Sequence, residues 1–448
     1  MAPGVATLPF SERIFFERQG IYNQRVAKRQ PQNAERLVLE ALHKRIQSIN
    51  LETSGPGEDD AFFVADLGEI HRLHSEWKRH LERVTPFYAV KCNPNPVVLR
   101  LLAALGTGFD CASIAEIRTI LSMRVDPSRI IFANPCKIMS AIKYAREQGV
   151  SKMTFDSAEE LHKIKQIFPE AQLFLRIVAC DPSALCQLSA KFGARVEAAE
   201  KLLKLAKALE LDVVGVSFHV GSGGKDPTAF TRAVRDASKV LHQAEQCGFR
   251  IHTLDIGGGF SAGPLFAETA GIINAALENY VSCDVRVIAE PGRYMVNSAF
   301  TAAATVIAKR GGDPHGEESN NLKPTMLYIN DGTYGSHYNS LCEVPAVPRV
   351  FRRANRTILE DRGRVESAPL QEYSIWGPTC DSVDCVNPTC KLPGDIQVGD
   401  WLFYRDMGAY TTSTASGFNG FAAHRDVCFV CSEPVVPALL NDFDASSS

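Results

Sequence analysis

The sequence predicts a two-part fold, a closed (β/α)8 barrel followed by an all-β domain. Between residues 86 and 300, eight short apolar runs alternate with segments that are apolar at helical spacing. After residue 300, strand-like runs follow one another with only Gly, Pro and Asp turns between them. Strands that alternate with helices form a parallel sheet, and eight of them favour a closed barrel. An open doubly wound sheet is less favoured, because no strand ends in GxGxxG.

The eight predicted barrel strands are short, apolar and bounded by turn residues. They cover residues 86–91, 107–111, 130–133, 152–155, 172–178, 213–219, 251–256 and 285–290. Helical spacing is clearest between them at 196–211, VEAAEKLLKLAKALEL.

The all-β part is predicted from five further runs, 301–309, 324–330, 371–377, 400–405 and 426–431. The N-terminal segment ends in FFVAD and is expected to add strands to this part. We therefore predict an N-terminal segment (1–66) that contributes to the β domain, a barrel (67–300) and a C-terminal β barrel or sandwich (301–448). The polar tail 442–448 is predicted to be an exposed loop.

Composition excludes several classes of protein. The 448 residues are 45% hydrophobic and 22% charged, as in ordinary globular proteins, and the net charge of −3 would attract neither nucleic acid nor an anionic membrane. No apolar run reaches transmembrane length, and the start of the chain lacks a signal-peptide pattern, so we expect a cytoplasmic protein. The 13 cysteines show no two CxxC pairs at zinc spacing, and no metal site is expected.

One lysine stands at the end of the first predicted strand. Lys91 closes the apolar run PFYAVK, just before a turn rich in Asn and Pro. A sheltered lysine amine is what a Schiff base with a carbonyl cofactor needs. A lysine that reaches from the strand end into water is the structural alternative. This segment alone favours neither interpretation.

Other strand ends suggest a phosphate site. In a (β/α)8 barrel the active site lies where strands end in loops, and phosphate usually binds after strands seven and eight. Gly257, Gly258 and Gly259 follow the seventh strand, and Arg293 follows the eighth. Glycine N–H groups approach an anion closely, and an arginine binds it bidentately. This placement favours a phosphate site over a simple tight turn, and Ser222 after strand six adds a hydroxyl donor.

A buried acid and a histidine complete the pattern. Glu290 ends an apolar run, and a carboxylate beside a pyridine nitrogen would keep that nitrogen protonated. The structural alternative is an ion pair with Arg293. His219 is either a core histidine or an imidazole stacked on a cofactor ring. With Lys91 and the phosphate site, these residues describe a site for pyridoxal 5′-phosphate (PLP).

The chain resembles the eukaryotic ornithine decarboxylases, which belong to the group IV PLP-dependent decarboxylases. The resemblance covers about residues 60–430 and rests on seven motifs in order: PFYAVKCN (86–93), GFDCAS (108–113), SFHVGSG (217–223), LDIGGGF (254–260), AEPGRY (289–294), WGPTCDSVD (376–384) and MGAYT (407–411). It implies an alanine-racemase-like barrel with a C-terminal β domain and a head-to-tail homodimer that shares its two active sites.

The resemblance also implies a role for each matching residue. Lys91 would hold PLP, Glu290 would pair with its pyridine nitrogen and His219 would stack on its ring. The phosphate ligands would be Ser222, Gly257, Gly258, Gly259, Arg293 and Tyr410, with Asp110 and Arg176 supporting the cofactor. Cys380 would enter the neighbouring subunit's site and protonate the α-carbon after carbon dioxide leaves. Asp381 would bind the distal amine of the substrate there.

One segment departs from the family. After NDGTYG (330–335), which contains the expected substrate residue Tyr334, the family continues to Tyr-Asp-His, whose aspartate binds the distal amine of ornithine. This chain reads SHYNSLCEVP (336–345). Without a gap, Cys342 and Glu343 take the tyrosine and aspartate positions, whereas one inserted residue would put Val344 in place of the acid. Either change alters the length or charge of the pocket and so its substrate discrimination.

Decarboxylation of an ornithine-type L-amino acid, with an altered distal-amine pocket, is therefore the main prediction. It would serve polyamine or fungal alkaloid metabolism, as in the loline pathway, and ornithine turnover would be weak. The alternatives are a true ornithine decarboxylase that makes putrescine, an arginine or lysine decarboxylase, and an inactive, antizyme-inhibitor-like binding protein. The retained cofactor residues favour an enzyme over the inactive protein.

Overall fold

The computed structural model describes residues 31–446 except 51, 180, 182, 186–187, 225, 312–323, 342, 344, 355–356 and 361–368. The first 30 residues of the predicted N-terminal segment therefore lie outside the described residues. So do Cys342 and Val344.

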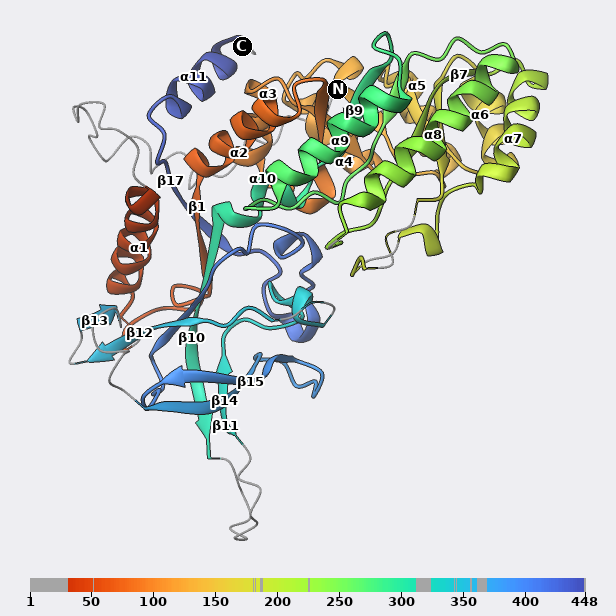
Figure 1. Ribbon diagram of the computed structural model, residues 1–448. Helices are drawn as coiled ribbons and strands as arrows, with labels where there is room; N and C mark the ends of the chain where they lie inside the picture. Colours follow the sequence, from red (N-terminus) through yellow and green to blue (C-terminus); the bar gives the residue numbers. More distant parts are fainter. Residues whose placement is uncertain are drawn as a thin grey trace, which may run out of the picture.

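Eight parallel strands form a closed barrel, which confirms the predicted fold class (Figure 1). They are β2 (Val84–Ala89), β3 (Gly108–Cys111), β4 (Ile130–Phe132), β5 (Lys152–Phe155), β6 (Gln172–Ile177), β7 (Asp212–Phe218), β8 (Thr253–Asp255) and β9 (Arg286–Ala289). Each strand pairs in parallel with the next, and β2 pairs with β9 to close the barrel.

Helices surround the barrel as an outer layer (Figure 1). They are α2 (Leu67–His80), α3 (Pro96–Ala104), α4 (Ile114–Ser122), α5 (Met139–Glu147), α6 (Ala158–Ile167), α7 (Val196–Ala208), α8 (Thr228–Gln246), α9 (Phe266–Tyr280) and the short α10 (Arg293–Val296). Several begin at a side-chain cap, as where Ser113 accepts from the Glu116 N–H and Ser157 from the Glu160 N–H. These caps fix where the loops at the strand ends stop.

Large side chains fill the barrel interior. Phe87, Ile131, Phe174, Val214 and Ile288 come from five strands and form one buried cluster. Neighbouring glycines make room for the two rings: a Cβ on Gly108 would lie 2.6 Å from the Phe87 ring, and one on Gly215 would lie 2.7 Å from the Phe174 ring. The barrel is therefore a packed core, and ligands can bind only at its ends.

The second part is built on a nine-stranded sheet with the order β13-β12-β16-β10-β11-β14-β15; outside this order, β1 pairs with β10 and β17 pairs with β1. Its strands are β1 (Phe62–Asp66), β10 (Phe300–Arg310), β11 (Thr325–Ile329), β12 (Arg349–Ala354), β13 (Thr357–Glu360), β14 (Leu370–Trp376), β15 (Cys385–Pro393), β16 (Trp401–Tyr404) and β17 (Asp426–Val430). All five predicted strands are present. The N-terminal β1 lies between β10 and β17. Leu42 and Ile46 of helix α1 (Pro31–Ser48) belong to one buried cluster with Trp401 and Phe62 of this sheet.

Four elements differ from the sequence prediction. Strands β12, β13 and β15 were not predicted; β15 contains Pro388, which sits where the pairing with β14 is irregular. The predicted loop 442–448 is wrong over its described part, since helix α11 (Val436–Ser446) continues to Ser446. Its Leu440 and Phe443 pack against the main core.

The first barrel strand ends earlier than predicted. β2 stops at Ala89, and Lys91 lies in a 3-10 turn, Val90–Cys92. The turn is held where the buried Tyr88 hydroxyl donates to the Asn93 carbonyl (3.0 Å). Lys91 therefore stands beyond the sheet, at the carboxyl end of the barrel.

Among the described residues, no helix is long and apolar enough to cross a membrane, and no cluster of acidic, histidine or cysteine side chains could hold a metal ion.

Candidate active site

A cleft of about 310 Å³ opens at the carboxyl ends of the barrel strands. Its lining contains most of the predicted cofactor residues: Lys91, His219, Ser222, Gly258, Gly259, Glu290, Arg293 and Tyr410. Ala89, Phe260 and Gly292 complete the wall and were not predicted. Asp110, Gly257 and Arg176 do not line the cleft but act on residues that do.

Lys91 forms an ion pair with Asp110 at the end of β3. The side chain of Lys91 is 42% exposed because it faces the cleft, whereas that of Asp110 is 1% exposed. Burial alone would lower the pKa of Lys91, but its interactions outweigh burial and raise the pKa, chiefly the charge of Asp110, to which the hydrogen bond to that carboxylate adds. The lysine is therefore an ammonium without a ligand, in contrast to the deprotonated amine that a Schiff base needs.

His219 is a neutral imidazole. Its pKa lies well below the ordinary value because the ring is buried, and the charges of Arg176 and Lys91 add to this. Nδ1 accepts a hydrogen bond from the Gly221 N–H (3.0 Å), which leaves the proton on Nε2. The ring is thus fixed in both orientation and tautomer on the wall of the cleft.

Two carboxyl groups, those of Glu290 and Asp255, are buried close to each other at this end of the barrel. Burial raises the pKa of Glu290, and the charge of Asp255 raises it further. Burial also raises the pKa of Asp255, at the end of β8, although its Oδ1 accepts a hydrogen bond from the Gly257 N–H (2.8 Å), which lowers the pKa. Two acids this close share protons rather than ionise together. The positive charge of Arg176, from β6, lowers the pKa of both groups and so opposes the effect of burial.

The three glycines allow two loops to approach closely. Gly257 has a φ of +63° and packs against the Phe218 carbonyl. A Cβ on Gly258 would lie 2.7 Å from His219 Nε2 and 2.9 Å from the Glu290 carbonyl oxygen. Gly258 and Gly259 face the cleft, whereas Gly257 supports them from behind. The segment 257–259 can therefore form a tight turn and also present its N–H groups to an anion.

Arg293 is held from two directions. Its guanidinium lies 5.4 Å above the centre of the Tyr410 ring. Its Nη2 donates to Glu343 Oε1 (2.5 Å) and its Nη1 to Oε2 (3.4 Å). The structural alternative for Glu290 was an ion pair with Arg293; the structure instead pairs Arg293 with Glu343, a residue from the β domain.

The cleft fits PLP on two observations. Among the described residues, Asp110 Oδ1, Asp255 Oδ2 and Arg293 Nε are buried and have no hydrogen-bond partner. The arginine provides an open donor beside Gly258 and Gly259, as a phosphate requires, and the acids provide buried oxygens near Glu290 and Lys91. An anionic group at one end and a basic ring nitrogen at the other would match this distribution.

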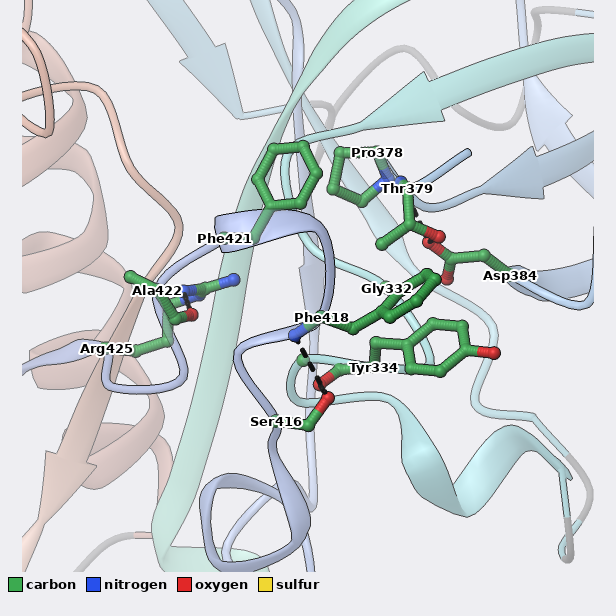
Figure 2. A pocket seen from close by; sticks show the side chains of 11 residues that line it. Gly332, Tyr334, Pro378, Thr379, Asp384, Ser416, Phe418, Phe421, Ala422 and Arg425 are labelled. Carbon is green, nitrogen blue, oxygen red and sulfur yellow. Dashed lines mark hydrogen bonds between the residues drawn. The ribbon is translucent and has the colours of Figure 1, made fainter. Parts of the chain in front are cut away.

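Cys380, Asp381 and Tyr334 lie elsewhere. None of them lines the Lys91 cleft. Tyr334 lines a second pocket of about 230 Å³ in the β domain, where its ring stacks on Phe418 at 4.5 Å between centres (Figure 2). The Tyr334 hydroxyl donates to Asp381, and the Cys380 N–H donates to Asn419 Oδ1 (2.8 Å). Cys380 is exposed.

Asp384 is a residue of this second pocket whose importance the sequence did not reveal. Its buried carboxylate accepts from the N–H and hydroxyl of Thr333 (2.7 and 3.0 Å) and from those of Thr379 (3.0 and 2.7 Å). It therefore joins the loop of Tyr334 to the loop of Cys380 and Asp381 (Figure 2). Its place in the motif WGPTCDSVD was the only signal available.

The comparisons agree with this geometry. Residues 67–297 match the family described as "Pyridoxal-dependent decarboxylase, pyridoxal binding domain". The chain is 48% identical to ornithine decarboxylase of Neurospora crassa, over 91% of this chain and 88% of that protein. It is 42% identical to decarboxylase flvG of Aspergillus flavus (90% and 93%) and 46% identical to antizyme inhibitor 2 of Xenopus laevis (84% and 82%).

A solved structure is also similar. The arginine decarboxylase of Paramecium bursaria Chlorella virus has a TM-score of 0.77 and 35% identity to this chain, and the match covers 84% of this chain and 97% of the viral enzyme. The fold, the cofactor site and the motifs therefore agree, and the cofactor is pyridoxal 5′-phosphate. The chain belongs to the eukaryotic ornithine decarboxylase family of PLP-dependent amino-acid decarboxylases.

Proposed function

We propose that the chain decarboxylates L-ornithine, and that Glu343 takes the position of the acid that meets the distal amine. The observation that carries this proposal is that the cleft joins Lys91, Glu290 and Arg293 with a carboxylate, Glu343, on the arginine at its edge. The ungapped alignment puts Glu343, an acid, at that position. The 48% identity to the Neurospora ornithine decarboxylase over most of both chains supports the same substrate.

Each cleft residue has a proposed task. Lys91 is the attachment point for PLP, and its ammonium must lose its proton before the amine can act as a nucleophile. Asp110 holds this nitrogen in place through the ion pair. When bound, PLP withdraws electrons from the α-carbon of the attached substrate, so that the carboxylate can leave as carbon dioxide.

The other tasks concern the cofactor's ends. Glu290 holds a proton at the buried end of the cleft, where the ring nitrogen would lie. Neutral His219 presents a fixed face to the ring. Ser222, Gly258 and Gly259, with Arg293 and Tyr410, would hold the phosphate. Gly257, Asp110 and Arg176 support these residues without lining the cleft.

We propose that the working enzyme is a homodimer in which Cys380 and Asp381 complete the partner's cleft. Both residues lie outside the cleft of their own chain, and Cys380 is exposed. The thiol of Cys380 is proposed to protonate the α-carbon. Phe418 and Phe421 lie nearby on the same surface, each 42% exposed, and give this face the apolar character of an interface.

A different amino acid is a second candidate. Glu343 is one methylene longer than the family's aspartate, and it is bound to Arg293 rather than free in the cleft. This favours the main prediction from the sequence, an altered distal pocket, and decarboxylase flvG is a relative of similar length. The comparisons nevertheless support ornithine better than an altered substrate, because the ornithine decarboxylases are the more similar relatives.

A non-catalytic role is the third candidate. The 46% identity to an antizyme inhibitor is nearly as high as that to the enzymes, so overall identity cannot separate them. The retained cleft residues favour catalysis over this role, because a binding protein has no need for an ion-paired Lys91 or a buried Glu290.

Carbon dioxide release from ornithine, lysine, arginine and N-substituted diamino acids tests these candidates. We expect ornithine to have the highest kcat/KM, with lysine lower by about 10-fold or more because one methylene in a pocket is worth about 10–200-fold. A higher kcat/KM for another amino acid would show an altered pocket. No release from any of them, with PLP bound, would favour the binding protein.

A further inference from the structure

Glu343 uses both terminal nitrogens of Arg293. The two carboxylate oxygens lie 2.5 and 3.4 Å from Nη2 and Nη1. The side chains of Arg293 and Glu343 are only 16% and 22% exposed, so this ion pair is more protected from water and salt than a surface pair. A bidentate arginine–carboxylate pair has the same fork geometry that binds a phosphate.

The backbone fixes Glu343 at this place. Its N–H donates to the Asn339 carbonyl (2.7 Å), at the end of a 3-10 turn, Tyr338–Leu341. The Asn339 amide donates to the Ala409 carbonyl (3.0 Å), and the next N–H, of Tyr410, donates to the Cys92 carbonyl (2.9 Å). The turn that carries Glu343 is thus tied to the turn that carries Tyr410, next to Lys91.

Few other cations could neutralise a phosphate here. Among the residues that line the cleft, only Lys91 and Arg293 carry a positive charge, and Lys91 is paired with Asp110. Arg293 also keeps its Nε buried and without a partner among the described residues. An N–H left in this state costs free energy, so Glu343 satisfies the arginine only in part.

We propose that Glu343 and the cofactor phosphate compete for Arg293. In the ligand-free protein the carboxylate occupies the arginine; PLP binding displaces it and frees Glu343 to face the substrate. No covalent bond changes in this exchange, in which one bidentate ion pair replaces another. Glu343 is thereby a positioning residue that lowers cofactor affinity and links cofactor loading to the assembly of the specificity pocket. The competition for Arg293 goes beyond the proposed function and rests on the PLP site alone, whereas the role of the freed Glu343 toward the substrate rests on the proposed function.

Binding of PLP and of pyridoxal, which lacks the phosphate, to the cofactor-free full-length protein tests the competition. We expect Glu343→Gln, which keeps the shape and removes the charge, to raise PLP affinity about 10-fold, or about 1.4 kcal/mol. Pyridoxal affinity should stay unchanged, because pyridoxal makes no demand on Arg293. Absorbance titration of the bound cofactor gives both constants without measuring turnover.

Two further variants serve as a second test and as a control. Glu343→Asp, one methylene shorter, should reach Arg293 less well and raise PLP affinity by a smaller factor; it serves if the Gln variant does not fold. Glu200→Gln removes an exposed partner of Lys204 and should change neither affinity. Unchanged or weaker PLP binding in both Glu343 variants would overturn the proposal, as would equal changes for PLP and pyridoxal. Failure of ornithine decarboxylation would leave these binding results unaffected.

Discussion

The two pockets of this chain differ in whether a single copy of the chain supplies all of the residues that they need. The cleft at the barrel end gathers Lys91, Glu290 and Arg293 around one space, from the segments that follow two strands, β2 and β9. In the pocket of the β domain, Tyr334 stacks on Phe418 (Figure 2). Cys380, which follows Thr379 of this pocket, is exposed. The cleft has the charged groups that a cofactor needs. Cys380 and Asp381, beside the second pocket, do not line the cofactor cleft of their own chain.

This difference follows from the positions of the two sets of residues in the fold. Parallel strands that close into a barrel bring all their carboxyl ends to one face, so loops distant in sequence meet there. Cys380 and Asp381 lie instead on a loop after β14, held by Asp384 to the loop of Tyr334. Cofactor binding should therefore be a property of one chain, and complete catalysis a property of two.

Removing the attachment lysine should have the largest effect. Lys91→Ala should lower kcat by at least about 10⁴-fold, because the nucleophile is lost. Borohydride reduction followed by mass spectrometry should find no cofactor on the chain. Lys201→Ala, at an exposed position of α7, should keep both the activity and the added mass. Activity retained without Lys91 would show that the cleft is not the site of attachment.

The exposed cysteine should be needed for turnover but not for cofactor attachment. Cys380→Ala should lower kcat by about 10²-fold or more, the usual range for loss of a general acid. Borohydride should still fix PLP to Lys91, since Cys380 does not line that cleft. Cys283, also exposed, provides the matched control as Cys283→Ala. Loss of cofactor attachment in Cys380→Ala would contradict the separation of the two pockets.

The carboxylate that joins the two loops should affect stability and activity together. Asp384→Asn cannot accept all four hydrogen bonds, and leaving a buried donor without an acceptor costs about 1–3 kcal/mol. We expect a lower Tm and a lower kcat with PLP affinity unchanged. Asp212→Asn, at an exposed position, is the control. A normal kcat with the lower Tm would mean that Asp384 stabilises the loops without positioning Cys380.

The buried acids should make the cofactor-free protein less stable at higher pH. Burial raises the pKa of Asp255 to about 7, so the folded protein binds more protons than the unfolded chain. The stabilisation is complete below the unfolded pKa and is lost as the pH rises through the folded value. Urea unfolding should show a loss on the order of 1–3 kcal/mol between pH 5 and 8.

Asp255→Asn should flatten this pH dependence, whereas Glu200→Gln, an exposed acid, should leave it intact. The same slope in the Asp255 variant and in the unaltered protein would show that another group is responsible. No corresponding effect is expected from Asp381 beside the β-domain pocket, because the hydrogen bond from Tyr334 lowers the pKa of this carboxyl, so that its contribution to stability is lost only at lower pH.

The sequence predicts the barrel and its cleft well because both depend on local patterns. Buried parallel strands are short apolar runs, and the residues directly after them must share one face. Strand β15 was missed because Pro388 is unusual within a strand, and only its irregular pairing with β14 accommodates it. The C-terminal helix was missed because its polar residues resemble a loop, while the packing of Leu440 and Phe443 determines its end.

Contacts between residues distant in the chain could not be predicted from the sequence. Arg293 and Glu343 are 50 residues apart and come from different domains, so the ion pair depends on how the turns at 338–341 and 409–410 meet. Asp255 and Glu290 follow neighbouring strands, but their mutual effect on pKa depends on burial. The motif containing Asp384 was visible, whereas its four partners were not.

Mixing two defective variants tests the central claim most directly. If one chain supplies the cofactor cleft and its partner supplies Cys380, random reassembly of Lys91→Ala with Cys380→Ala should restore up to about one quarter of the normal activity, because half of the dimers would carry one intact site. At the same protein concentration, Lys91→Ala alone should be inactive and Cys380→Ala alone should keep about one hundredth of the normal activity or less. Failure of the mixture to recover activity, with subunit exchange verified by mass spectrometry, would contradict a site shared between the two chains.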